Sequence, residues 1–181
     1  MFVAVGCDRG WTRSGPSCYK VFPVTQSLYT SAQDLCQSNG ANLASIETET
    51  ENLFLKTLLD DARSTGVLGP NQDVWLGAKR PDSRSNFMWN SGFQTIFSDW
   101  GDHFGSQAEG PEDLYYDYPA LCLQMFKNAN PTWRWGVANC DGHDIDNEIV
   151  CEKTSEGMIK FLLFHDFMRL VIYCRSSRCY P

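Results

Sequence analysis

The eight cysteines of this 181-residue chain constrain its fold more than any other feature. They are spread from Cys7 to Cys179, and no two of them stand in a Cys-x-x-Cys pair. An even number of dispersed cysteines is typical of disulfides formed in an oxidising compartment, and not of zinc sites or thiol redox sites. Eight cysteines can pair on the order of a hundred ways, so the count alone does not fix the bonds. We therefore expect a secreted or extracellular, disulfide-bonded protein.

Composition supports one packed domain with an appendage. Hydrophobic residues make up 43% of the chain, enough for a sizeable core, and the net charge is -7 with no cluster of lysines or arginines. A nucleic acid is therefore not expected as a partner, because its binders need a basic face. No apolar run reaches the roughly 18 residues of a spanning helix. Residues 1–6 are interpreted as an N-terminal remnant, since Met1–Val5 is shorter than the roughly 7–15 apolar residues of a signal core.

The first 60 residues show a hairpin pattern followed by two helical patterns. Cys7–Phe22 is typical of two short strands around a Ser-Gly-Pro turn. The apolar spacing of residues 27–38 predicts a helix that ends at Asn39-Gly40. A second helix is predicted to begin at Thr48, which forms a capping box with Glu51. Its expected buried stripe consists of Phe54, Leu55, Leu58, Leu59 and Ala62.

The stretch from Trp133 to Cys151 sets one large apolar face beside an acidic segment. Trp133, Trp135 and Val137 alternate with smaller or polar residues, which predicts a strand. Between Cys140 and Cys151 the chain is crowded with acidic and amide residues, namely Asp141, Asp144, Asp146, Asn147 and Glu148. Their spacing does not match a helix-loop calcium site, so a solvated acidic loop is expected.

Taken together, these stretches resemble a C-type lectin-like domain of the long form, over Cys7 to Lys153. The resemblance is carried by short motifs in a fixed order: Cys7 and Cys18, the helix with Ala32 and Cys36, Gly40–Ile46, Val74-Trp75-Leu76-Gly77-Ala78, Phe87-Met88-Trp89, Asp99-Trp100, Cys122, Trp135 with Asn139-Cys140, and Cys151-Glu152. We expect residues 7–153 to form this domain and residues 154–181 to form an apolar C-terminal extension.

The resemblance implies an α+β fold in which two helices flank small antiparallel sheets and a long irregular loop. It also implies the disulfides Cys7–Cys18, Cys36–Cys151 and Cys122–Cys140. Cys174 and Cys179 lie beyond the family pattern and are expected to pair locally or across chains. The extension is therefore one possible route to an oligomer.

In sugar-binding members of the family, a calcium ion is held by side-chain oxygens of the long loop and of the strand after it. Calcium takes about 6–8 oxygen ligands. Here Gly110-Pro111-Glu112 stands in place of the loop triplet, Ala120 in place of a glutamate, and Gly136-Val137 in place of an Asn-Asp pair. Only Glu112 offers a side-chain oxygen, so no metal or other cofactor is expected. A calcium-dependent lectin with a rearranged site, using Gln107 or Glu109, remains the alternative.

With the metal ligands missing, the long loop is expected to bind its ligand through aromatic and acidic side chains. The candidate ligand-binding residues are Glu109, Glu112, Asp113, Tyr115, Tyr116, Asp117 and Tyr118. An equally weighted alternative is that some of these tyrosines pack the loop against the core. The expected partner is a protein, or alternatively a glycan. A third hypothesis is a structural role in matrix or mineral, served by the acidic surface.

Catalysis is not expected. The three histidines, His103, His143 and His165, form no catalytic or metal-binding motif. The extension from Met158 to Tyr173 is apolar, but it carries charges and is too short to span a bilayer easily. A binding module is therefore the predicted function.

Overall fold

The computed structural model describes residues 6–24, 28–81, 85–101, 121–127, 132–141 and 147–155. Two helices, α1 (Tyr29–Ser38) and α2 (Glu49–Ser64), accompany eight strands. The strands are β1 (Thr12–Ser14), β2 (Ser17–Phe22), β3 (Asn42–Leu43), β4 (Val74–Arg80), β5 (Met88–Trp89), β6 (Leu121–Phe126), β7 (Arg134–Asn139) and β8 (Glu148–Thr154). This is the α+β architecture implied by the resemblance.

The strands form one mixed sheet in the order β1-β2-β8-β4-β6-β7, with β3 paired to β8 and β5 paired to β4. Two antiparallel groups are present, as expected, but they are not separate sheets. A short parallel pairing joins them, in which Val74 and Trp75 of β4 lie opposite Glu148 and Ile149 of β8. Sequence patterns could not show this pairing, because it depends on where two distant strands come to lie.

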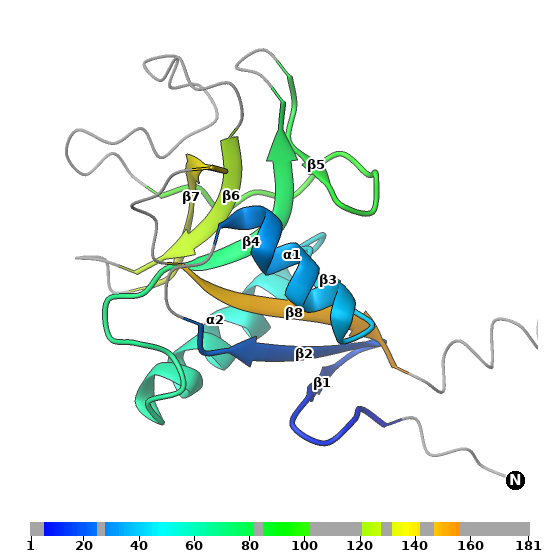
Figure 1. Ribbon diagram of the computed structural model, residues 1–181, viewed down its shortest axis with the longest axis vertical. Coiled ribbons are helices and arrows are strands. Elements are labelled where there is room, and N and C mark those ends of the chain that lie inside the picture. Colours follow the sequence, from blue (N-terminus) through cyan, green and yellow to red (C-terminus); the bar gives the residue numbers. More distant parts are fainter. Residues whose placement is uncertain are drawn as a thin grey trace, which may run out of the picture.

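Helices cover both faces of the sheet, with α1 in front and α2 behind in the view of Figure 1. Successive residues of β4 and β8 therefore alternate between two apolar cores. Val74 and Leu76 pack with residues of α2, whereas Trp75 packs with residues of α1. Because both faces of the two central strands are buried, β4 and β8 form a rigid centre from which the loops at either end extend.

The structure contains the three disulfides that the resemblance implies: Cys7–Cys18, Cys36–Cys151 and Cys122–Cys140. The first closes the N-terminal hairpin, the second ties α1 to β8, and the third ties β6 to the residue after β7. Cys174 and Cys179 lie outside the described residues. In the part of the chain that is described, no helix is long and apolar enough to cross a membrane.

Both predicted helices are present, with differences at the level of single residues. Helix α1 begins at Tyr29, two residues later than predicted, and buries Tyr29 with Ala32 and Cys36. Helix α2 begins with the predicted capping box of Thr48 and Glu51. In the predicted stripe of α2, Phe54 and Leu58 are only partly buried. The stripe also includes a polar residue that was not predicted, Asn52, which is 3% exposed.

Candidate binding surface at the base of the long loop

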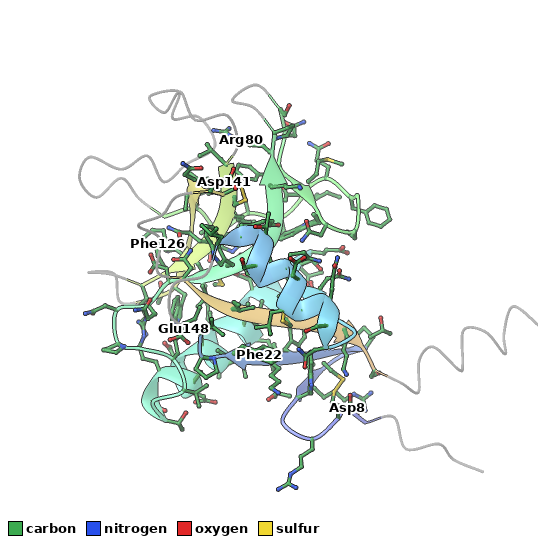
Figure 2. All side chains as sticks on the ribbon, in the orientation of Figure 1. Asp8, Phe22, Arg80, Phe126, Asp141 and Glu148 are labelled. Carbon is green, nitrogen blue, oxygen red and sulfur yellow. A yellow bond between two sulfur atoms is a disulfide. The ribbon has the colours of Figure 1, made fainter. Side chains whose placement is uncertain are left out.

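The long loop comprises residues 90–120, between β5 and β6, and the structure describes its first part, residues 90–101. The seven predicted ligand-binding residues, Glu109, Glu112, Asp113, Tyr115, Tyr116, Asp117 and Tyr118, lie outside the described residues, as do Gly110 and Ala120. What can be described is the base that holds this loop. It is formed by residues 85–101 together with β6 and β7, and Figure 2 labels Phe126, the last residue of β6.

An aromatic cluster holds the base together around Trp135. The rings of Trp89, Phe97 and Trp100 lie 5.8, 5.7 and 5.9 Å from the Trp135 ring, each in an edge-to-face arrangement. The backbone adds two hydrogen bonds, from the Trp135 N–H to the Asp99 carbonyl (2.8 Å) and from the Gly101 N–H to the Trp135 carbonyl (2.9 Å). The prediction that Trp133 and Trp135 form a large apolar face is confirmed, since both are 0% exposed.

A polar network centred on Asp99 joins the long loop to α2 and to β7. One oxygen of Asp99 accepts a hydrogen bond from Asn52 (2.7 Å) and pairs with Lys56 (2.5 Å). Its other oxygen pairs with Arg134. Asn52 in turn accepts a hydrogen bond from the indole N–H of Trp135 (3.0 Å). The network therefore links the last described turn of the long loop to the aromatic cluster beneath it.

These contacts lower the pKa of Asp99. Burial alone would raise the pKa of this carboxyl group, but the hydrogen bonds from Lys56, Asn52 and Arg134 and the charge of Lys56 outweigh the effect of burial. A carboxyl group whose pKa is lower in the folded state adds stability above its unfolded pKa. That stability is lost as the pH falls below about 4 and through the folded pKa.

We therefore expect Asp99→Asn to cost about 2 kcal/mol of unfolding free energy at pH 7, because hydrogen bonds to a charged group are lost. The variant should also lose less stability than the parent protein between pH 4 and pH 2. Urea unfolding at several pH values measures both effects. Asp34→Asn, at an exposed position of α1, is the matched control. Parallel pH profiles of the Asp99 variant and the parent protein would contradict this prediction.

A buried phenylalanine, Phe126 of β6, packs against Gly136 of β7, the position at which sugar-binding members of the family carry a calcium ligand. A Cβ atom added to Gly136 would lie 2.9 Å from Cε1 of Phe126, and one added to Gly101 would lie 2.4 Å from Cζ. Phe126 is only 3% exposed, so its ring packs between these two glycines. An asparagine at position 136 would have to displace the ring, and Val137 offers no side-chain oxygen. The residues at these two positions do not fit a calcium site.

The segment after Cys140 is less solvated than predicted. Asp141 is exposed, but Asn147 and Glu148 are 3% and 4% exposed. Asn147 donates a hydrogen bond to Gln124 (2.7 Å), and Glu148 accepts one from the Gly69 N–H (3.0 Å). The prediction of a solvated loop was wrong for these two residues, because Glu148 is the first residue of the central strand β8 and Asn147 directly precedes it, so both are buried. Among the described residues, no group of three or more His, Cys, Asp or Glu side chains could hold a metal ion.

Three apolar side chains at the base of the long loop face solvent: Met88 is 40% exposed, Phe93 68% and Ile96 95%. Residues 85–98 contain no charged side chain, although the whole chain carries a net charge of -7. We name Met88, Phe93 and Ile96 the apolar patch. Sequence reasoning missed it, and the long uncharged segment was the signal that could have revealed it.

A family model described as the lectin C-type domain matches residues 25–153. The chain belongs to the C-type lectin domain family. Struthiocalcin-2 of Struthio camelus is 32% identical over 99 residues, which cover 52% of this chain and 69% of that protein. A snaclec of Echis carinatus, part of a coagulation factor IX/factor X-binding protein, is 28% identical over 139 residues, covering 76% of this chain and 93% of the snaclec.

The C-type lectin fold is also found in solved structures. A calcium-independent type II antifreeze protein aligns with a TM-score of 0.60 at 21% identity, covering 86% of this chain and 99% of that one. At this identity the likeness shows the fold alone. Other C-type lectin relatives are far longer: the chain spans only 8% of the secretory phospholipase A2 receptor of Bos taurus.

Proposed function

We propose that this chain is an extracellular recognition module that binds a protein ligand without calcium at the family's usual site. The observation that carries the proposal is the packing of Phe126 against Gly136. It leaves no room for a metal-ligating side chain unless the ring moves. Extracellular location is supported by the three disulfides, which persist in oxidising compartments. No catalytic role is proposed.

The apolar patch supports a protein as the ligand. The centres of protein–protein interfaces are poor in charge and rich in aromatic residues and methionine. Phe93 and Met88 have this character, and they lie at the base of the loop whose tyrosines we propose as contacts, Tyr115, Tyr116 and Tyr118. The name of the snaclec relative, a coagulation factor IX/factor X-binding protein, describes a protein ligand for another member of the family.

A calcium titration tests the proposal directly. A ligand that binds only the native state, present at a concentration of 100 times its Kd, would stabilise the native state by about 2.7 kcal/mol. For a chain of this size, that corresponds to a rise of about 5–10 °C in the melting temperature. We expect no saturable heat in calorimetry, and melting temperatures in millimolar calcium and in EDTA that agree within about 1 °C. A calcium-dependent rise of several degrees would overturn the calcium-independent part of the proposal.

The alternatives predict different outcomes in binding assays. A calcium-dependent lectin with a rearranged site would bind an array of immobilised glycans in calcium and release them in EDTA. A matrix or mineral protein would bind calcium carbonate or phosphate crystals through its acidic surface. Such binding would not respond to Phe93→Ala or Tyr116→Ala. We expect neither result, and either one would overturn the choice of a protein ligand.

A further inference from the structure

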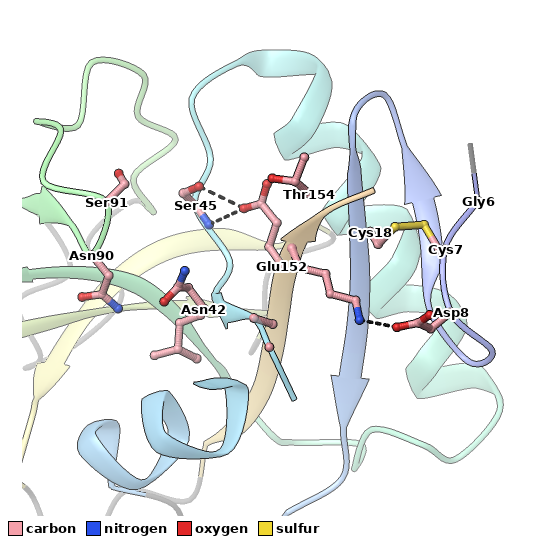
Figure 3. A pocket seen from close by; sticks show the side chains of 14 residues that line it. Gly6, Cys7, Asp8, Cys18, Asn42, Ser45, Asn90, Ser91, Glu152 and Thr154 are labelled. Atoms are coloured by element: carbon pink, nitrogen blue, oxygen red, sulfur yellow. Dashed lines mark hydrogen bonds and ion pairs between the residues drawn. A yellow bond between two sulfur atoms is a disulfide. The ribbon is translucent and has the colours of Figure 1, made fainter. Parts of the chain in front are cut away.

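A cleft of about 480 Å³ lies where the N-terminal hairpin, the loop before β3, the end of β8 and the turn after β5 meet. Figure 3 shows Asn42 and Asn90 on one side of this cleft and Asp8 on the other. Glu152 lies between them. The volume of the cleft is within the range of sites that hold small molecules or short peptide segments.

The charged groups of the cleft already have partners. Lys153 pairs with Asp8, and its ammonium group also lies 4.4 Å from the centre of the Trp11 ring. Glu152 accepts four hydrogen bonds, one each from the hydroxyl groups of Ser17 (2.7 Å) and Tyr19 (3.2 Å), and two from the N–H and hydroxyl of Ser45 (3.0 and 2.9 Å). A carboxylate has about four lone-pair positions, so Glu152 is saturated. A ligand of this cleft must therefore find its partners among neutral groups.

A chain of three side-chain amides supplies those neutral groups. Gln33 of α1 accepts hydrogen bonds from the Asn90 amide (2.7 Å) and from the Leu43 N–H (3.1 Å), and donates one to the Asn42 amide oxygen (3.0 Å). The Tyr29 hydroxyl donates to the Asn90 oxygen (3.2 Å). These bonds fix which end of each amide is free. The Asn42 NH₂ group remains able to donate, and the Asn90 oxygen keeps one lone pair able to accept.

One donor beside one acceptor matches the peptide unit, which carries one N–H and one C=O. We propose that this cleft binds an extended, uncharged peptide segment of a partner protein, which accepts a hydrogen bond from Asn42 and donates one to Asn90. The choice of a protein partner rests on the proposed function, but the site is separate from the apolar patch. Gln33 is a positioning residue, because it acts on the ligand only through the two asparagines.

The walls of the cleft favour a peptide over a sugar. Ala41, Leu43 and the Cys7–Cys18 disulfide line it, which suits small aliphatic side chains. The lining contains no aromatic ring among the described residues, so a sugar ring would have no flat face against which to stack. A peptide therefore makes fuller use of this cleft than a carbohydrate does.

The test uses nitrogen-15 NMR spectra of the whole chain in EDTA, with N-acetyl-Ala-Ala-Ala-N-methylamide as the probe. We expect saturable shifts of the side-chain NH₂ signals of Asn42 and Asn90 at millimolar probe. Asn42→Ala and Asn90→Ala should each weaken the affinity at least fivefold. Asn86→Ala, at another exposed asparagine, should leave it unchanged. Gln33→Ala should weaken the affinity and broaden the Asn90 signal, whereas Gln37→Ala, one turn later on α1, should do neither.

The proposal would be overturned if the probe caused no saturable shift in the parent protein. It would also be overturned if Asn86→Ala weakened the affinity for the probe as much as Asn42→Ala or Asn90→Ala does. Saturable shifts with methyl glucoside but not with the peptide would also overturn it, in favour of a sugar site. Each of these outcomes is independent of the calcium titration. Failure of the cleft proposal can therefore be told apart from failure of the proposed function.

Discussion

Replacing both Cys36 and Cys151 with alanine should lower the free energy of unfolding by about 5 kcal/mol. The bond closes a loop with a sequence separation of 115, and the loop-entropy model assigns about 4.7 kcal/mol to a loop of 100 residues. Both cysteines are 0% exposed and pack in the same apolar core as Trp75. Because a domain of this size is stabilised by only about 5–15 kcal/mol, a loss of this magnitude brings the domain close to unfolding at room temperature.

The Cys7–Cys18 bridge provides a matched control within the same chain. Its sequence separation is 11, and the same model assigns about 3 kcal/mol to a loop near that length. Urea unfolding of the two double-alanine variants should therefore rank them, with the Cys36/Cys151 variant the less stable. Failure of that variant alone to fold would give the same ranking. A Cys7/Cys18 variant that is equally or less stable would contradict the prediction.

Much of the scaffold could be predicted because its signals are local. The capping box at Thr48, the apolar face of Trp133 and Trp135, and the hairpin before Phe22 each depend on residues close together in the sequence. The disulfide pairing is not local, and only the family resemblance provided it. The same resemblance pointed to Gly136 and Val137 as the positions where calcium ligands are missing.

The remaining features could not be predicted because they depend on contacts between distant segments. Nothing around Asn52 in the sequence distinguishes it from an exposed helical asparagine, yet it lies between Trp135 and Asp99. The fit of Phe126 between Gly101 and Gly136 joins three separate stretches. The amide chain that holds Asn42 and Asn90 at the cleft likewise joins α1, β3 and the turn after β5. These contacts determine how the candidate sites are held, so the sequence indicated where to look but not how the residues are arranged.

Asn52→Ala should cost about 3–4 kcal/mol, because it removes a partner from the buried Trp135 indole and from the half-buried carboxylate of Asp99. The Trp135 indole N–H loses its acceptor, which costs about 1–3 kcal/mol, and Asp99 loses a donor to its carboxylate. Chemical unfolding measures the loss. Asn86→Ala, an asparagine-to-alanine change at an exposed position, should stay within about 0.5 kcal/mol of the parent protein. A similar small effect at Asn52 would show that the network does not hold the base of the long loop.

Asn52→Asp separates the hydrogen bonds from the packing, because the aspartate has nearly the same shape. It keeps an acceptor for Trp135, but it sets a second carboxylate against Asp99 where an amide donated before. When two carboxyl groups lie side by side, the pKa of one of them is raised, because two negative charges at this distance repel each other. A raised pKa in the folded state means that stability is lost as the pH rises through that pKa. Relative to the parent protein, the variant should therefore be least stable at pH 7 and regain stability toward pH 5, where a protonated carboxyl group can donate to its neighbour. A stability difference that stays constant between pH 7 and pH 5 would show that Asn52 acts through its shape alone.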